Sequence, residues 1–336
     1  MRSLKDNLKL SSFSHIYVES RALENRNTKK ILSYFKSSKI IEINHYKDVF
    51  CRKNQDFSVQ KLSPNIILAV KEGNLIYKGA EVCENFGNKY FYYTSAVMNC
   101  IYNCEYCYLQ GMYPSANIVV FVNLQEVFRE VEDSLKKHPL YLCISYDTDI
   151  LALENILGFT RQWIEFTRNH KNLSIEIRTK SANFKSIEDL QPCENVILAW
   201  TFSPEKVSAK YESNAPTFES RLMDAKLAIS RGCKVRICFD PILYVRNWRK
   251  YYYECIERVF EAISPSAIED VSIGVFRISK EYMKNMKKVN LRSEILAYPF
   301  ESKHGVCTYS TEHCMEIKNF IYNILVKYVE IEKIFV

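Results

Sequence analysis

Three closely spaced cysteines are the residues of this sequence with the clearest chemistry. Cys100, Cys104 and Cys107 form a C-x3-C-x2-C pattern, with a tyrosine directly before the third cysteine. Proteins usually hold an iron–sulfur cluster with four cysteines, so a triad predicts a [4Fe–4S] cluster with one iron open to a small molecule. Structural zinc sites instead pair C-x2-C knuckles and close four ligands. No second knuckle follows here, which favours the cluster.

The composition of the chain excludes some classes of protein and favours others. Only 8 of 336 residues are glycine, and neither a GxGxxG nor a Walker phosphate loop occurs. Hydrophobic residues make up 47% and charged residues 25%, as in a globular protein with a sizeable core. The 12 cysteines, with no apolar run in Met1 to Leu10, predict reduced thiols and neither signal peptide nor membrane span. The net charge of +7 is compatible with a nucleic-acid partner.

The elements that must position the cysteines alternate between strand and helix after residue 88. Strands are predicted at 89–97, 140–146, 173–179, 196–202, 234–239 and 270–276. Helices are predicted between them at 124–137, 151–170, 185–190, 217–231 and 248–263. Six strand–helix units call for parallel strands but are too few to close an eight-stranded barrel. We therefore expect an α/β protein built on an open, partial (β/α)6 barrel, with its chemistry at the carboxyl ends of the strands.

The chain ends differ from this central pattern. Residues 1–88 predict a mixed α/β extension, with strands at 15–18, 40–43 and 66–70 and a helix at 22–35. Residues 281–336 begin basic and irregular and close with a helix near 314–328. The predicted division is thus an N-terminal extension at 1–88, a barrel at 89–280 and a C-terminal segment at 281–336.

The cysteine motif resembles that of the radical S-adenosylmethionine (SAM) enzymes, whose partial barrel agrees with the predicted fold. The run Cys-Glu-Tyr-Cys-Tyr-Leu-Gln at 104–110 narrows the resemblance to the spore photoproduct lyase family, in a clostridial-like variant. Further matches to that family follow in order along the chain, at Tyr17–Glu24, Thr148–Ile150, Arg178–Lys180, Thr201–Glu205 and Asp240–Tyr244.

The resemblance implies a carbon–carbon lyase that repairs DNA. The family reverses the spore photoproduct, 5-thyminyl-5,6-dihydrothymine, to two thymines. A 5′-deoxyadenosyl radical made from SAM takes a hydrogen from C6 of the lesion, the bridge breaks, a hydrogen is returned, and SAM is regenerated. The implied partners are damaged DNA and a one-electron reductant such as ferredoxin or flavodoxin. The implied location is the cytoplasm of the spore core, with no membrane.

The family match also assigns roles to residues at the strand ends. Lys180 is expected to pair with the SAM carboxylate, and the hydroxyls of Thr148 and Thr201 to hydrogen-bond SAM where the family has serines. Asp240 is expected to contact SAM mainly through its backbone. Tyr106 and Tyr108, beside the last cluster cysteine, are implied members of a hydrogen relay near the substrate.

The cysteine that returns the hydrogen in this family is absent here, because Tyr146 stands at its position. Two other thiols are candidates. Cys143 lies three residues upstream on the same predicted strand, where alternation turns it to the opposite face from Tyr146. Cys83 lies in a polar loop before the first barrel strand, and such a loop can fold across the barrel mouth. We therefore favour Cys83 as the donor and expect Cys143 to pack in the core.

Basic and aromatic residues near the C-terminus are candidates for holding DNA. The family uses a C-terminal β-hairpin to expose the lesion, and residues 296–309 correspond to it, although they are less basic than expected. The candidate DNA contacts are Arg246, Trp248, Arg249, Arg277, Lys303 and His304.

Two other functions remain open from the sequence. A radical SAM enzyme acting on RNA or protein would share the cluster motif and the barrel. A basic iron–sulfur protein that binds nucleic acid without catalysis is disfavoured, because an open iron has no purpose without SAM.

Overall fold

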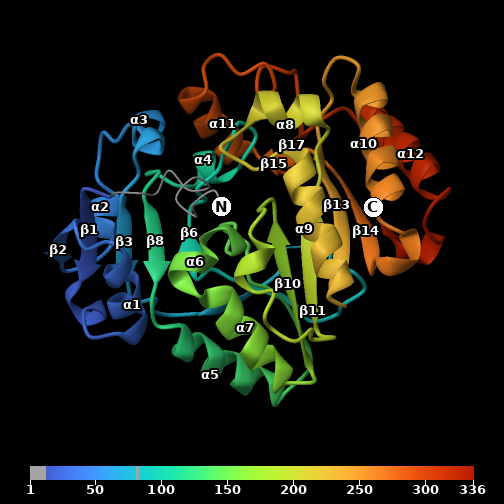
Figure 1. Cartoon of the computed structure of the whole chain (residues 1–336). Helices are drawn as coiled ribbons and strands as arrows, with labels where there is room; N and C mark the ends of the chain where they lie inside the picture. The colour runs from blue at the N-terminus through green and yellow to red at the C-terminus, as the bar shows by residue number, and fades with distance from the viewer. Residues whose placement is uncertain (1–12, 81–82) are drawn as a thin grey trace.

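The protein is described from a computed structural model that covers residues 13–80 and 83–336 (Figure 1). The segment Met1 to Leu10, where neither a signal peptide nor a membrane span was expected, lies outside the described residues. Within the described part of the chain, no helix is both long and apolar enough to cross a membrane.

The central feature is an eight-stranded sheet in the order β18-β14-β13-β11-β10-β9-β5-β4. All neighbours from β5 to β18 are parallel, and only β4 runs antiparallel, on β5. The strands are β4 (Ile76–Lys78), β5 (Phe91–Thr94), β9 (Leu140–Cys143), β10 (Leu173–Thr179), β11 (Val196–Thr201), β13 (Lys234–Ile242), β14 (Asp270–Val275) and β18 (Ile334–Phe335). The sheet ends at β4 and β18, so the barrel is open and the predicted partial barrel is confirmed.

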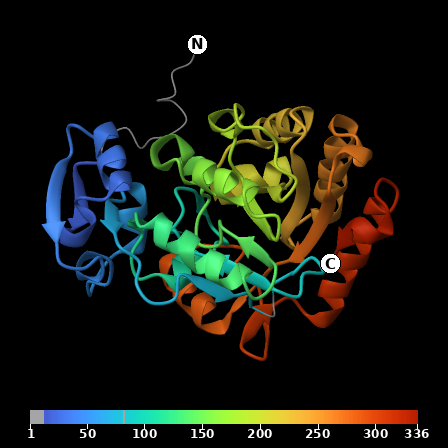
Figure 2. The same ribbon diagram turned by 90° about the horizontal axis from the view of Figure 1, so that it is seen from below.

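Helices cover the outer side of this curved sheet (Figures 1 and 2). They are α5 (Leu124–Leu135), α7 (Phe159–Arg168), α9 (Phe218–Ser230), α10 (Trp248–Ala262) and α12 (Thr311–Leu325). Helix α9 shows how the sequence sets such boundaries. Thr217 caps its start by accepting a hydrogen bond from the Ser220 amide, and Gly232 ends it with a φ of 82°, a conformation that favours glycine.

A second, five-stranded sheet lies beside the barrel, in the order β2-β1-β3-β8-β6. Its strands are β1 (His15–Glu19), β2 (Lys39–Ile43), β3 (Ile66–Ala69), β6 (Val97–Met98) and β8 (Ile118–Phe121), with helix α1 (Arg26–Tyr34) following β1. The sheet therefore takes strands from both sides of residue 88. The segment boundaries at 88 and 280 stay predictions.

The C-terminal part contains the expected hairpin. Strands β16 (Glu301–Lys303) and β17 (Val306–Thr308) pair antiparallel around His304 and Gly305. A third strand, β15 (Arg277–Ser279), pairs with β17. Between β15 and β16 the chain forms helix α11 (Lys280–Val289), so the prediction of an irregular segment there was wrong. Ser279 starts this helix by accepting a hydrogen bond from the Tyr282 amide.

Three other local predictions were wrong. The helix predicted at 151–170 is interrupted at Gly158, whose φ of 66° separates α6 (Glu154–Leu157) from α7. The helix predicted at 185–190 is only a 3-10 turn at Phe184–Ser186, where the Phe184 amide donates to Asp224. The strand predicted at 140–146 ends at Cys143, so strand alternation does not extend to Tyr146.

Lys71, which follows β3, is a buried cation between the two sheets. Its ammonium donates to the Ser95 carbonyl at 2.9 Å and lies 4.9 Å from the centre of the Tyr77 ring. Burial lowers its pKa from 10.5 to about 8. Since the unfolded chain then binds more protons than the folded one between these values, Lys71 makes stability rise as pH increases through that window.

We expect Lys71→Met to remove this pH dependence. A pKa lowered from 10.5 to about 8 corresponds to roughly 3 kcal/mol. Between pH 7 and pH 10 the unfolding free energy of wild type should therefore rise by up to that much through Lys71, and that of the variant should not show this rise. Denaturant unfolding at both pH values measures the difference, with exposed Lys78→Met as control. If the unfolding free energies of wild type and Lys71→Met changed by the same amount between pH 7 and pH 10, the prediction would be contradicted.

Candidate active site

The cysteine loop begins at a sharply turned asparagine after β6. Asn99 has a φ of 69°, which asparagine tolerates better than most residues. Its side-chain amide donates to the carbonyls of Ser115 and Asn117, both at 2.7 Å. These bonds hold the start of the loop, and Cys100 follows directly.

Short backbone and side-chain bonds hold the rest of the loop. Strand β7 (Asn103–Cys104) pairs antiparallel with β12 (Glu212–Ser213). The Cys104 carbonyl accepts from the Cys107 amide at 3.0 Å and from the Gln110 side chain at 2.7 Å. The three cysteines are therefore carried by one ordered loop that follows the first barrel strand, as predicted.

The three thiols, one buried and two half-buried, suit an iron–sulfur cluster. Burial raises the pKa of Cys100 to about 12 and also raises the pKa values of Cys104 and Cys107, and the Cys100 and Cys107 thiols raise that of Cys104 further. All three are free of disulfides. Thiolates in such a place need a bound cation, and cluster iron is a soft one that cysteine sulfur prefers.

A single metal ion fits this loop less well. Among the described residues, no three His, Cys, Asp or Glu side chains are arranged to hold one ion. A structural zinc ion is closed by four protein ligands, whereas this loop offers three thiols, so the loop suits a cluster with one open iron better than zinc.

Glu212 connects the cysteine loop to the polar residues at the strand ends. Its fully buried carboxylate accepts from the Tyr106 hydroxyl, from Arg221 and, at 2.7 Å, from Ser203. The Lys180 ammonium lies 3.3 Å from the same carboxylate. Burial alone raises the pKa of Glu212, but Lys180 and Arg221 lower it to about 2. No motif in the sequence pointed to this residue.

Of the residues expected to contact SAM, Lys180 directly follows β10 as predicted, whereas Thr148 lies beyond the end of β9. The Lys180 amide donates to Asp149 at 2.6 Å, and its side chain is 14% exposed. The Thr148 hydroxyl is buried and has no hydrogen-bond partner among the described residues. Buried polar groups are rarely left unpaired, so this hydroxyl is free to bond a ligand. Thr201 is also buried, and its carbonyl accepts from Arg221 at 3.2 Å.

The Asp240 carboxylate has a partner within the barrel. It pairs with Arg178 at 3.0 Å and lies against Gly274, where a β-carbon would overlap it. Arg178 also pairs with the buried Glu176 at 3.0 Å. The side chain of Asp240 therefore serves the barrel interior, which leaves its backbone for the expected SAM contact.

Cys83 lies next to the residue that replaces the family's donor cysteine. Its sulfur is 3.7 Å from the Tyr146 hydroxyl, and the thiol is half-buried. The Tyr146 ring stacks on Tyr93, with centroids 4.0 Å apart. Cys143 is instead buried within β9, where burial raises its thiol pKa to about 12.

Comparison with known proteins decides the family. A family model described as "Spore photoproduct lyase" matches residues 12–301, most of the chain. The chain belongs to the spore photoproduct lyase family. The curated spore photoproduct lyase of Clostridium acetobutylicum is 22% identical over 244 residues, 69% of this chain and 72% of that protein. The spore photoproduct lyase of a Geobacillus strain is 20% identical over 194 residues, 56% of each chain.

Solved structures of spore photoproduct lyase share the fold. A complex with dinucleoside spore photoproduct has a TM-score of 0.83 at 17% identity, and the match covers 96% of this chain and 99% of that one. A mutant with bound AdoMet and dinucleoside spore photoproduct has a TM-score of 0.82 at 17% identity, covering 97% and 98%.

The two tyrosines assigned to the spore photoproduct lyase relay have different surroundings here. The Tyr106 hydroxyl is buried and donates to Glu212. The Tyr108 hydroxyl donates to the Tyr146 carbonyl at 2.6 Å. Tyr108 is therefore the one that reaches the Cys83 side of the site, whereas Tyr106 supports the cysteine loop.

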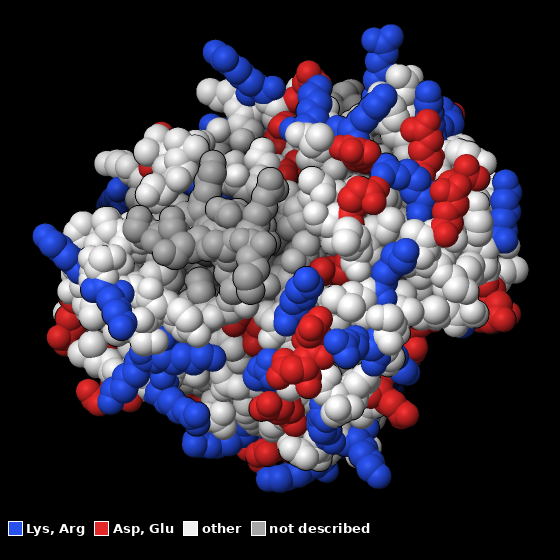
Figure 3. Space-filling view, viewed as in Figure 1, with Lys and Arg blue, Asp and Glu red and all other residues white. Residues whose placement is uncertain are grey.

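The candidate DNA contacts of this spore photoproduct lyase family member differ in their exposure and in the partners they already have. Arg246 and Arg277 are exposed, and His304 lies at the hairpin turn. Lys303 pairs with Glu301 at 3.0 Å, and Arg249 pairs with Glu316. The expectation that Trp248 contacts DNA is corrected, because its side chain is 4% exposed and packs between Tyr244 and Phe320. On the face shown in Figure 3, basic and acidic side chains are interspersed.

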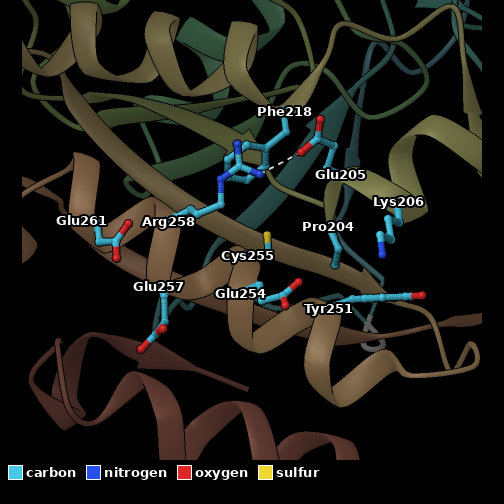
Figure 4. A pocket seen from close by; sticks show the side chains of 10 residues that line it. All are labelled: Pro204, Glu205, Lys206, Phe218, Tyr251, Glu254, Cys255, Glu257, Arg258 and Glu261. Atoms are coloured by element: carbon cyan, nitrogen blue, oxygen red, sulfur yellow. Dashed lines mark hydrogen bonds and ion pairs between the residues drawn. The ribbon is translucent and has the colours of Figure 1, made fainter.

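A separate cavity of about 280 Å³ lies among the outer helices α8 (Glu205–Tyr211), α9 and α10 (Figure 4). Arg258 crosses it, lying over the Phe218 ring at 4.5 Å and donating to Glu205 at 2.9 Å. None of the predicted site residues lines this cavity.

Proposed function

We propose that this protein is a radical SAM lyase that reverses the spore photoproduct in DNA to two thymines. The observation that carries the proposal is the cysteine triad beside Lys180 and the unpaired Thr148 hydroxyl, in a chain of the spore photoproduct lyase family. Three protein thiolates leave one iron for SAM, and these two polar residues are the partners we propose for its amino-acid group.

The chain's own residues hold and orient the cofactors. Cys100, Cys104 and Cys107 would hold the [4Fe–4S] cluster, and when bound the cluster and SAM supply the hydrogen-abstracting radical chemistry. Lys180, held by Glu212, pairs with the SAM carboxylate. Thr148 offers its hydroxyl to SAM. The further contacts we propose are the Thr201 hydroxyl and the Asp240 backbone.

Cys83 returns the hydrogen to the substrate. Once the bridge between the thymines breaks, the product carries an unpaired electron and needs one hydrogen atom. Cys83 is half-buried, forms no disulfide, and contacts Tyr146, the residue at the position of the missing family cysteine. Tyr108 serves on the same side of the site.

The partners in this proposal are damaged DNA and a low-potential one-electron reductant of the ferredoxin or flavodoxin class. We place the reaction in the spore core, where the lesion forms. Arg246, Arg277, Lys303 and His304 are the proposed phosphate contacts, and such contacts position a duplex without reading its sequence. The lesion must also leave the stack, at a cost of about a few kcal/mol that damage reduces.

Binding to lesion-containing DNA should be salt-dependent. With three or four phosphate contacts, we expect the affinity to fall roughly 40- to 150-fold between about 50 and 200 mM salt. Arg246→Gln should weaken binding and reduce the slope of log affinity against log salt by about 1. Fluorescence anisotropy measures both slopes. An affinity that does not change with salt would favour a substrate other than nucleic acid.

The experiment that tests the function is an anaerobic repair assay. Reduced, reconstituted protein is incubated with SAM and dinucleoside spore photoproduct, and thymidylyl-thymidine is the expected product. Release of 5′-deoxyadenosine without repair would favour a radical SAM enzyme acting on RNA or protein. A protein that cleaves no SAM would be a non-catalytic iron–sulfur protein.

A further inference from the structure

The hydroxyl of Tyr146 lies beside the Cys83 thiol, and the alignment of Tyr146 with the family's donor cysteine does not explain this contact. Its hydroxyl bonds the Cys83 sulfur at 3.7 Å, and either atom can be the donor. The Tyr93 ring stacks on it at 4.0 Å and holds the phenol in place, while Tyr77 stacks on Tyr93 at 5.3 Å. A phenylalanine would pack equally well in this stack, so the hydroxyl serves the thiol.

We propose that Tyr146 is a further catalytic residue, which returns a hydrogen atom to Cys83 after each repair event. This inference rests on the proposed function and deepens it. The position that holds the donor cysteine elsewhere in the family thus keeps a hydrogen-donating group here, one step behind the thiol.

Each step moves one hydrogen atom, so no charge or external oxidant is needed. The Cys83 S–H bond breaks, a C–H bond forms on the product radical, and Cys83 is left as a thiyl radical. The Tyr146 O–H bond then breaks, the S–H bond of Cys83 forms again, and Tyr146 is left as a phenoxyl radical. The thiol is thereby ready for the next lesion.

Tyr108 is placed to restore Tyr146. Its hydroxyl donates to the Tyr146 backbone carbonyl at 2.6 Å, and the two rings are 6.3 Å apart. Its O–H bond breaks as that of Tyr146 forms again, and Tyr108 would then recover a hydrogen atom from the 5′-deoxyadenosine that the proposed reaction forms, so that no radical is left on the protein. Because Tyr108 directly follows the cluster cysteine Cys107, the hydrogen deficit moves from the substrate side to the cofactor side of the site.

Tyr146→Phe tests the relay, because it keeps the ring stack and removes only the hydroxyl. With enzyme in excess over dinucleoside spore photoproduct, the first turnover should stay within about twofold of wild type, since the Cys83 thiol is present. With substrate in excess, later turnovers should slow by about tenfold or more. Quenching after one turnover and alkylating the peptides should show Cys83 as a free thiol in wild type and depleted of free thiol in the variant.

The matched control is Tyr77→Phe, the same change in the ring farthest from Cys83 in this stack, which should behave as wild type. Wild-type multiple turnover and free Cys83 in Tyr146→Phe would overturn the relay while leaving the proposed function intact. Loss of the first turnover in that variant, with cluster and SAM cleavage intact, would also overturn it. Absence of repair by the unmodified chain would instead overturn the proposed function, and the relay with it.

Discussion

Replacing Cys100, Cys104 or Cys107 with alanine is expected to abolish SAM cleavage. Each change removes one of three ligands, and a cluster held by two protein thiolates is neither fully assembled nor correctly oriented toward SAM. Iron and sulfide content after anaerobic reconstitution, together with 5′-deoxyadenosine release, measures the loss. Iron content, sulfide content and 5′-deoxyadenosine release should all fall to background in the three variants.

Substitution of the other nine of the 12 cysteines should leave iron content near the wild-type value. Cys238→Ala is the sharpest control, since this thiol is fully buried in β13 and burial raises its pKa to about 12, as it does for Cys100. If a fourth cysteine were equally necessary for the cluster, no iron would be open and the SAM-based account would fail.

The second large effect is expected from Cys83→Ala. The cluster, SAM cleavage and the first hydrogen abstraction should persist, because none of them uses this thiol. The product radical should then last long enough to be trapped by dithionite-derived species or other quenchers. Chromatography with mass spectrometry should show adducts as the main products in place of clean thymidylyl-thymidine.

Cys143→Ala is the matched control for this prediction. Its thiol is buried within β9, whereas the Tyr146 hydroxyl contacts Cys83, so the product distribution should stay close to wild type. Clean repair by Cys83→Ala, with adducts from Cys143→Ala, would show that Cys143, and not Cys83, returns the hydrogen.

The barrel could be predicted because its signals are local. Six apolar strands alternate with connections that are mostly helical, and each strand appears within a few residues of its predicted place. Helix α11 and the break at Gly158 could not be predicted in the same way, since tertiary contacts decide them. One such contact is between Gly111 and α11, where a β-carbon on the glycine would overlap the Tyr282 carbonyl.

The site shows the same division between local and long-range information. The cysteines and Lys180 stand in motifs, so their roles could be inferred from neighbours in sequence. Glu212 acts on Tyr106 and Lys180 from over a hundred and over thirty residues away, respectively, and no local pattern marks it. The proximity of Cys83 to Tyr146 was expected, although the alternation argument against Cys143 relied on a strand that ends before Tyr146.

A lesion that carries deuterium at C6 tests the central claim most directly. Reduced, reconstituted protein is incubated anaerobically with SAM and the labelled dinucleoside, and both the repaired product and the recovered SAM are examined by mass spectrometry. We predict thymidylyl-thymidine as the product, with deuterium transferred to the recovered SAM. Intact lesion, or repair in which all deuterium stays at C6, would contradict the account.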